Sequence, residues 1–128
     1  MASRDETLEL ATYLASLTYD QLPSEVIHQA KASILNALGC ALGVVDCEFS
    51  RKAFAAHLGH DLSSTASSAE ADCTILGRRE RTNVDKASFL NGIAITTRDF
   101  DDIHLRTVVH SSGRPLSAIL PWAEKHHL

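Results

Sequence analysis

The sequence predicts an all-α, mainly helical fold, and its composition and its hydrophobic periodicity support that prediction. Hydrophobic residues make up 45% of the 128 residues, whereas aromatic residues make up only 5%. Abundant alanine and leucine with few aromatics favour helices packed through small side chains over a strand-rich sandwich. Apolar residues also recur at helical spacing in several segments. Because the chain has the length of one ordinary domain, we expect residues 1–128 to form a single domain.

Two helices are predicted in the first third of the chain. Ser3 and Glu6 have capping-box spacing, and leucines then recur at helical spacing, which predicts a helix from about Asp5 to Leu17. Pro23 suits the first turn of a second helix, which continues along an apolar stripe through Leu42. Residues 37–43 of that segment have little bulk, so we expect them to pack closely against another helix. Cys40, within that segment, is expected to be a buried apolar thiol.

The sequence in the middle of the chain predicts a short helix, a loop and one short extended segment. Residues 50–58 are compatible with a third helix, and residues 61–72, rich in serine and alanine, predict a surface loop. The apolar run 73–76, ended by Gly77, is long enough for one small strand or an extended connector. Residues 78–81 predict a charged turn.

Two more helices are predicted towards the end of the chain. Asn83 is a suitable cap for a helix whose apolar face continues to about Thr97. That helix would deliver the aspartates of residues 99–102 to its carboxyl end, where negative charges oppose the helix dipole. A final helix is predicted over residues 116–126, with Pro121 inside it, where proline removes a backbone hydrogen bond.

Three carboxylates and two imidazoles are concentrated in residues 99–110. Asp99, Asp101 and Asp102 are followed by His104 and His110. Neighbouring carboxylates shift one another's ionisation, and histidine titrates near neutrality, so this composition is typical of an acid/base site. The remaining histidines, at positions 28, 57, 60, 126 and 127, have no such neighbours in the sequence, and we expect them at the surface or in packing roles.

The overall composition argues against several classes of protein. The net charge is −4 with a pI near 5.9, and basic residues are not interleaved with aromatics, so nucleic acid is not an expected partner. The three cysteines lack CxxC spacing, which argues for reduced thiols instead of disulfides or a zinc site. The acidic start of the chain does not resemble a targeting peptide, and no apolar run approaches a membrane span. We therefore expect a soluble cytoplasmic protein.

Four motifs, in order, carry a resemblance to a known family. They are ILNALGCALG at 34–43, ILGR at 75–78, ASFLNG at 87–92 and DFDD at 99–102. With His110 and the pair Ala123-Glu124 further on, they make the chain from Leu14 to Glu124 similar to the N-terminal part of the MmgE/PrpD family. That family includes 2-methylcitrate dehydratase and cis-aconitate decarboxylase. The chain would then be a partial domain, namely the N-terminal helical region.

The resemblance implies an activity and the residues that perform it. Family members act on small tricarboxylic acids by proton abstraction followed by loss of water or carbon dioxide, without a metal or organic cofactor, and commonly form homodimers. Asp99 falls on the first aspartate of the family's DFDD stretch and His110 on the histidine of its HPS stretch, which implies catalytic roles. Asp102 and His104, from the family's DFDDTH pattern, and Arg78, which matches a basic position, would bind substrate. Asp101 is expected to be a solvated carboxylate at the helix end.

The resemblance also implies that the 128-residue chain is incomplete as an enzyme. Family members are several times longer, with further basic and hydroxyl-bearing catalytic residues beyond the part that resembles this chain. A tricarboxylate needs several cationic partners, so we expect little or no activity from these residues alone. The alternative interpretation is a truncated, inactive remnant or a helical interaction module that pairs with another chain.

Two other chemistries are compatible with the acidic cluster but less well supported. His104 and His110 could bind a divalent metal together with the aspartates, but their six-residue spacing lacks the one-face geometry of HExxH. Asp99-x-Asp101-Asp102 also resembles the acid motif of protonating terpene cyclases. Those enzymes need a large aromatic-lined cavity, and this chain has only one tryptophan, two tyrosines and four phenylalanines. The family resemblance implies neither a metal nor a cofactor, and we adopt that expectation.

Overall fold

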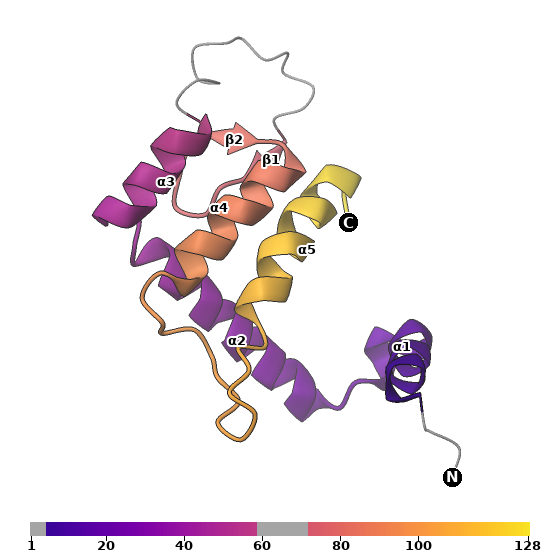
Figure 1. Ribbon diagram of the computed structural model, residues 1–128. Coiled ribbons are helices and arrows are strands. Elements are labelled where there is room, and N and C mark those ends of the chain that lie inside the picture. Colours follow the sequence, from indigo (N-terminus) through magenta and orange to yellow (C-terminus); the bar gives the residue numbers. More distant parts are fainter. Residues whose placement is uncertain (1–4, 59–71) are drawn as a thin grey trace. The chain divides into compact units, whose positions relative to one another are not determined.

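A computed structural model of the chain describes residues 5–58 and 72–128 and confirms the mainly helical fold (Figure 1). Two compact units, residues 1–31 and 32–128, meet within one helix and are described separately. The elements in chain order are α1 (Glu6–Ser16), the 3₁₀ helix η1 (Tyr19–Gln21), α2 (Ser24–Leu42), α3 (Glu48–Leu58), β1 (Cys73–Thr74), β2 (Arg81–Thr82), α4 (Val84–Thr96) and α5 (Gly113–His126).

The first unit contains α1 and η1. Asp5 caps α1, because its carboxylate accepts a hydrogen bond from the backbone nitrogen of Leu8 at 3.1 Å. An aspartate at this position satisfies one of the backbone N–H groups that a helix start leaves free. Ser3, the cap suggested by the sequence, lies outside the described residues, as does the serine-rich segment 59–71 with His60.

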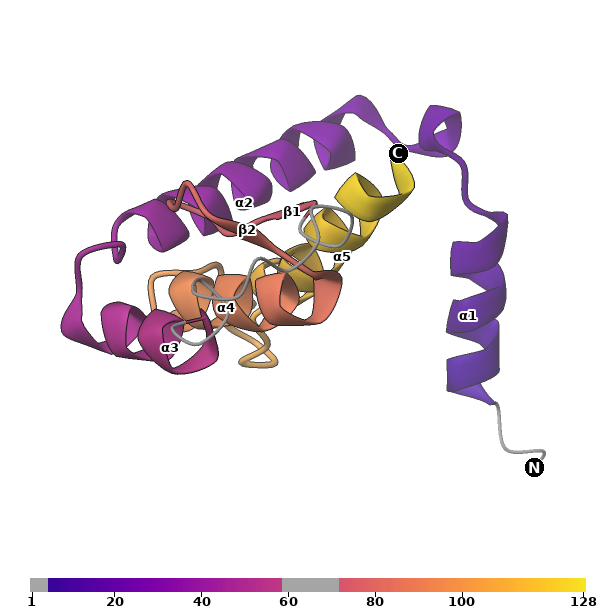
Figure 2. The ribbon, with the colours of Figure 1, turned by 90° about the horizontal axis from the view of Figure 1, so that it is seen from above.

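In the second unit, α4 lies between α3 and α5 (Figures 1 and 2). A core of small side chains joins this layer to α2. Ala37 and Ala41 of α2, with Val44 just after it, pack against Ala94 and Ile95 of α4. The close helix contact expected from the small residues of 37–43 is therefore confirmed for the alanine face of α2.

The glycine face of the same segment behaves differently. Gly39 and Gly43 are exposed, and Cys40 is half-buried. The expectation of a buried Cys40 thiol was therefore wrong. Because Ala37 and Ala41 turn towards α4, the glycines and Cys40 lie on another side of the helix.

The short extended segment is a strand, and it has a partner that the sequence did not suggest. Residues 73–74 form β1, which pairs antiparallel with β2, with Cys73 opposite Thr82 and Thr74 opposite Arg81. Arg81 therefore belongs to a strand and not to the predicted charged turn. Gly77 lies between the strands with φ of +77°, a left-handed conformation that favours glycine.

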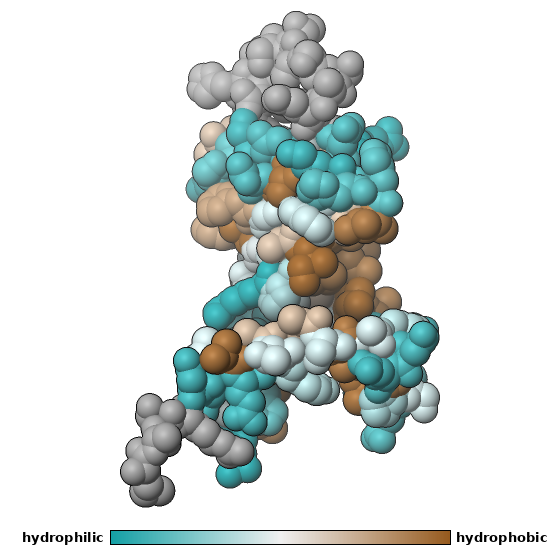
Figure 3. Space-filling view, turned by 90° about the vertical axis from the view of Figure 1, so that its right-hand side faces the viewer, coloured by the Kyte–Doolittle hydropathy of each residue, from teal (hydrophilic) through white to brown (hydrophobic). Residues whose placement is uncertain are grey.

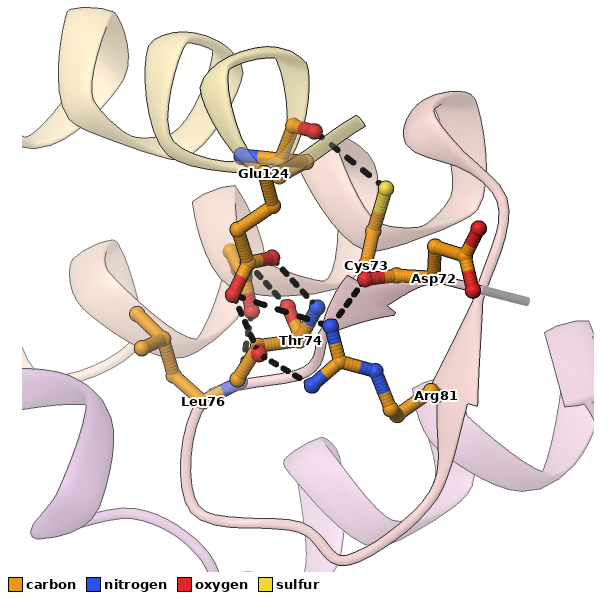
Figure 4. A network of polar contacts seen from close by, with 8 residues as sticks. Asp72, Cys73, Thr74, Leu76, Arg81 and Glu124 are labelled. Atoms are coloured by element: carbon orange, nitrogen blue, oxygen red, sulfur yellow. Dashed lines mark hydrogen bonds and ion pairs between the residues drawn. The ribbon is translucent and has the colours of Figure 1, made fainter. Parts of the chain in front are cut away.

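Polar side chains from α4 and α5 hold β1 in place (Figure 4). The carboxylate of Glu124 accepts hydrogen bonds from the Thr74 backbone nitrogen at 2.6 Å and the Thr74 hydroxyl at 2.5 Å. Arg81 donates to the same hydroxyl at 3.1 Å. The fully buried amide of Asn91 accepts from Leu76 N at 2.8 Å and donates to Thr74 O at 3.0 Å. This network holds α4 and α5 against β1. It therefore also fixes the two ends of the segment that connects α4 to α5.

Helix boundaries follow local chemistry. Asn83 caps α4 as predicted, since its side chain accepts from Lys86 N at 3.0 Å. α3 begins at Glu48 and α5 at Gly113, both earlier than the sequence suggested. Pro121 lies inside α5, as predicted, and is buried.

Apolar side chains also reach the surface of the described residues, as the brown atoms of Figure 3 show. In the second unit they include Leu35, Phe89, Phe100, Ile119 and Trp122. Within residues 5–58 and 72–128, no helix is long and apolar enough to cross a membrane.

Candidate active site

The acidic cluster lies in the segment that connects α4 to α5. After α4 ends at Thr96, the backbone nitrogen of Asp99 donates to Thr96 O at 3.2 Å and Asp99 adopts a left-handed φ of +56°. Aspartate is one of the few residue types that adopt this conformation readily. A short loop then closes through a bridge between His104 and Val109, with His104 N donating to Val109 O at 2.9 Å. This closure returns the chain to the aspartates at His110.

The imidazole of His110 lies between two carboxylates. Its Nδ1 is 3.1 Å from Asp101 Oδ2, and its Nε2 is 3.8 Å from Asp99 Oδ1. The two carboxylates differ sharply in environment, because the side chain of Asp101 is 1% exposed and that of Asp99 is 86% exposed. The predicted catalytic pair, Asp99 and His110, is therefore brought together.

Asp101 is buried, so the expectation of a solvated carboxylate at the helix end was wrong. Its side chain turns inward and packs beside Gly113, where an added Cβ would lie 3.4 Å from Asp101 Oδ2 and 2.6 Å from Ile95 Cγ2. Neither carboxylate oxygen has a hydrogen-bond partner among the described residues, and the approach of His110 Nδ1 is an ion-pair distance without hydrogen-bond geometry. Burying a carboxylate is costly unless a partner compensates, and the imidazole of His110 is the group within ion-pair distance of Asp101.

This arrangement gives the two nitrogens of His110 different tasks. Nδ1 lies on the side of the buried Asp101, so a proton on this nitrogen would face that carboxylate. Nε2 would then be free, on the side of the exposed Asp99, to accept or donate a proton. A titratable ring held in this way by a buried carboxylate is a common arrangement for acid/base catalysis.

The same atoms form the group best placed to hold a metal ion among the described residues. One ligand atom each from Asp99, Asp101 and His110 lie within 4.8 Å of one another. Two carboxylates and an imidazole are donors that divalent cations accept. The absence of a metal, which the resemblance implies, stays a prediction.

Asp102 forms hydrogen bonds with the two serines just before α5. Its carboxylate accepts from the hydroxyl of Ser112 at 2.6 Å, from that of Ser111 at 3.1 Å and from Ser112 N at 3.2 Å. Burial raises the pKa of Asp102, but these hydrogen bonds and the charge of His110 outweigh burial and leave the pKa below its ordinary value. The ionised carboxylate thus ties the site segment to α5.

Replacing Asp102 with asparagine should make the free energy of unfolding less dependent on pH in acidic solution. A pKa that is lower in the folded than in the unfolded state stabilises the fold above the ordinary value of 3.8, and this contribution is lost as pH falls through the lowered value. From the charged hydrogen bonds involved, we expect Asp102→Asn to cost about 1–2 kcal/mol at neutral pH and progressively less as the pH falls below 3.8. Urea unfolding of both proteins across this range measures the difference. An equal cost at both ends would show that the charge is unimportant.

Comparison with known proteins places this segment in a family. Residues 8–128 match the family model described as the MmgE/PrpD N-terminal domain. The chain belongs to the MmgE/PrpD family. It is 27% identical over 118 residues to the cis-aconitate decarboxylase-like protein oryM of Aspergillus oryzae and 25% identical over 118 residues to cis-aconitate decarboxylase of Aspergillus terreus. Each match covers 92% of this chain and 23% of the relative, so the chain spans about a quarter of their length. No solved structure matches the chain.

The other residues that the MmgE/PrpD resemblance assigned to substrate lie in different surroundings. His104 is exposed in the closing loop, with Nδ1 2.7 Å from the hydroxyl of Thr107. Arg78 donates to Val45 O at 2.8 Å, and its guanidinium lies over the Phe54 ring, 4.6 Å from the centroid. These contacts give Arg78 a packing role, and no described contact joins it to Asp99 or His110. Substrate binding by Arg78, His104 and Asp102 stays a prediction.

In this MmgE/PrpD domain the burial of Asp101 was missed by sequence reasoning, and one motif proved to be structural. The sequence placed Asp101 in the acidic cluster but predicted a solvated carboxylate, because a motif does not tell which aspartate of a turn faces inward. Gly113, three residues after His110, was the available signal, since a buried neighbour often explains a glycine. Asn91, from the ASFLNG motif, supports β1 and makes no contact with the cluster.

Proposed function

We propose that this domain supplies the proton-transfer part of the active site of a lyase that acts on small tricarboxylic acids. The reaction would be dehydration of a 2-methylcitrate-like substrate or decarboxylation of a cis-aconitate-like one. The observation that carries the proposal is the imidazole of His110 between the buried Asp101, at 3.1 Å, and the exposed Asp99, at 3.8 Å. The names of the relatives, cis-aconitate decarboxylases, support the second reaction.

The cluster can serve either reaction through one proton transfer. In dehydration, a C–H bond next to a carboxylate breaks and the proton passes to His110 Nε2, while the C–O bond on the neighbouring carbon breaks and its hydroxyl group takes up a proton from solvent and leaves as water. In decarboxylation, a carbon–carbon bond breaks to release carbon dioxide, and the electron pair left on carbon takes a proton from His110. Asp99, next to Nε2, helps to bind or deprotonate the substrate, and Asp101 orients the ring.

The remaining expectations are part of the same proposal. Asp102, His104 and Arg78 would contact or shape the substrate pocket, no cofactor would be needed, and the working form would be a cytoplasmic homodimer. Further cationic groups would have to come from outside these residues, because a tricarboxylate carries several negative charges to be matched.

The test is a chimaera in which the aligned segment of the Aspergillus terreus decarboxylase is replaced by residues 8–128 of this chain. We expect the folded chimaera to release carbon dioxide from cis-aconitate or water from 2-methylcitrate, and Asp99→Asn to lower its turnover at least tenfold. The unaltered decarboxylase is the positive control, and thermal unfolding verifies folding. A folded chimaera without turnover, or with turnover indifferent to Asp99→Asn, would contradict the proposal. Either outcome would favour an inactive remnant or interaction module.

A further inference from the structure

A cavity of about 410 Å³ opens beside the acidic cluster in the second unit. This volume lies within the range of roughly 300–1,000 Å³ that is usual for small-molecule sites. One wall comes from α2 and the residues after it, and the other from the two residues that flank Asp99. The lining includes Asn36, Gly39 and Cys40 on one side and Arg98 and Phe100 on the other.

The cavity and the cluster are connected. Asn36 Nδ2 donates to the Phe100 carbonyl at 3.2 Å, so α2 is fastened to the backbone that carries Asp99 and Asp101. Burial raises the pKa of the Cys40 thiol, and the negative charges of Asp101 and Asp102 raise it further. Those two carboxylates therefore lie within electrostatic reach of the cavity wall.

Arg98 brings a positive charge to this cavity. Within residues 5–58 and 72–128, its guanidinium has no hydrogen bond and no ion pair, in contrast to Arg78 and Arg81. A guanidinium presents its donors in a planar fork that matches the two oxygens of a carboxylate. The cavity thus has a cationic partner to offer to an anionic ligand.

Gly39 keeps the opposite wall open. A Cβ added at this position would meet no atom within 4 Å. Glycine is a poor helix former, and Gly39 lies in the last turn of α2, before the helix ends at Leu42. No neighbouring atom requires a glycine at this position. The missing side chain therefore leaves space in the cavity for a ligand.

We propose that this cavity binds one carboxylate group of the tricarboxylic acid, with the guanidinium of Arg98 as its ionic partner. Phe100, 73% exposed at the cavity, covers the hydrocarbon part of the ligand. The inference rests on the proposed function for the class of ligand, and it makes Arg98 a substrate-binding residue. Bound in this way, the acid would present its remaining carbons to Asp99 and His110.

The test uses the 128-residue chain and tricarballylate, a tricarboxylate that can undergo neither reaction. In a titration followed by ¹⁵N NMR, we expect saturable shifts at the amides of Gly39, Arg98 and Phe100. Arg98→Gln should raise the Kd at least tenfold, which is the loss of one well-placed ionic partner. Arg79→Gln, an equal change of charge at an exposed arginine outside the cavity, should stay within twofold of the wild type.

A second variant separates filling of the cavity from loss of the fold. Gly39→Leu should also raise the Kd at least tenfold while the thermal unfolding midpoint stays or rises, because leucine is the better helix former and its Cβ meets no atom. Absence of saturable shifts in the wild type, or unchanged affinity in Arg98→Gln or Gly39→Leu, would overturn the inference. Equal binding of inorganic phosphate to the same residues would overturn the carboxylate assignment.

These outcomes are distinguishable from failure of the proposed function. The NMR titration measures binding alone and requires no turnover, whereas the chimaera measures turnover. If binding depends on Arg98 but the chimaera is inactive, the proposed lyase function is rejected and the carboxylate-binding role of the cavity is supported. If the chimaera is active but Arg98→Gln does not change tricarballylate binding, the carboxylate-binding role of the cavity is rejected and the proposed lyase function is supported.

Discussion

Replacing His110 with alanine should lower the turnover of the chimaera by about 10²- to 10⁴-fold, the usual contribution of a positioned acid/base group. His110 is the imidazole that lies between Asp99 and Asp101, and no other described residue is within ion-pair distance of both carboxylates. Removing it takes away the group that carries the proton. The kcat of the purified protein on cis-aconitate and on 2-methylcitrate measures the effect.

Two further variants make this loss interpretable. His110→Ala leaves the buried Asp101 without its neighbour, so His110→Gln, which preserves most of the volume, should show a similar loss of turnover with less change in stability. His126→Ala removes an exposed imidazole that lies against Trp122, and its kcat should match the parent. Full turnover in a folded His110→Gln protein would exclude His110 as the proton-transfer group.

Gly77→Ala should lower the free energy of unfolding by about 2–5 kcal/mol. The left-handed backbone at +77° costs a residue with a Cβ about 1–2 kcal/mol. The new Cβ would also lie 2.3 Å from Val45 Cγ2, and such overpacking typically costs 1–3 kcal/mol. Gly77 lies in the turn between β1 and β2, so the damage would fall on the network that holds α4 and α5.

Gly39→Ala is the matched control for this prediction. It makes the same chemical change within a helix, where no atom lies within 4 Å of the new Cβ, and should stabilise the protein by about 1 kcal/mol. Urea unfolding of the three proteins gives the free energies. The two substitutions should therefore shift the transition midpoint in opposite directions. A Gly77→Ala protein as stable as the wild type would show that the turn tolerates another backbone conformation.

Periodicity and capping chemistry were sufficient to predict most of the helices. The fourth helix was predicted well because Asn83 supplies a cap and its apolar face repeats regularly, and both signals are local. The pairing of Arg81 with Thr74 was not predicted, because each strand is only two residues long, and the hydrogen bond of Thr74 to Glu124 joins residues fifty positions apart. The predicted start of α5 was three residues too late, because Gly113 and Arg114 are not typical residues for the first turn of a helix.

The candidate site was predictable in composition but not in geometry. The sequence indicated that Asp99 and His110 belong together, and the closing loop at His104 and Val109 brings them there. It did not indicate that Asp101 turns inward, because burial of that carboxylate depends on packing beside Gly113, twelve residues further along the chain. Arg98 was overlooked for a similar reason, since the cavity beside it is formed by α2, more than fifty residues earlier.

The central claim is that Asp99 and His110 act as one proton-transfer unit, and a double-mutant cycle on the chimaera tests it most directly. Turnover is measured for the parent, Asp99→Asn, His110→Ala and the double variant. Residues that act together lose most of their effect with the first substitution, so we expect the double variant to be within about threefold of His110→Ala. Losses that multiply, with the double variant slower by the product of both single effects, would show that Asp99 and His110 act independently and would contradict the claim.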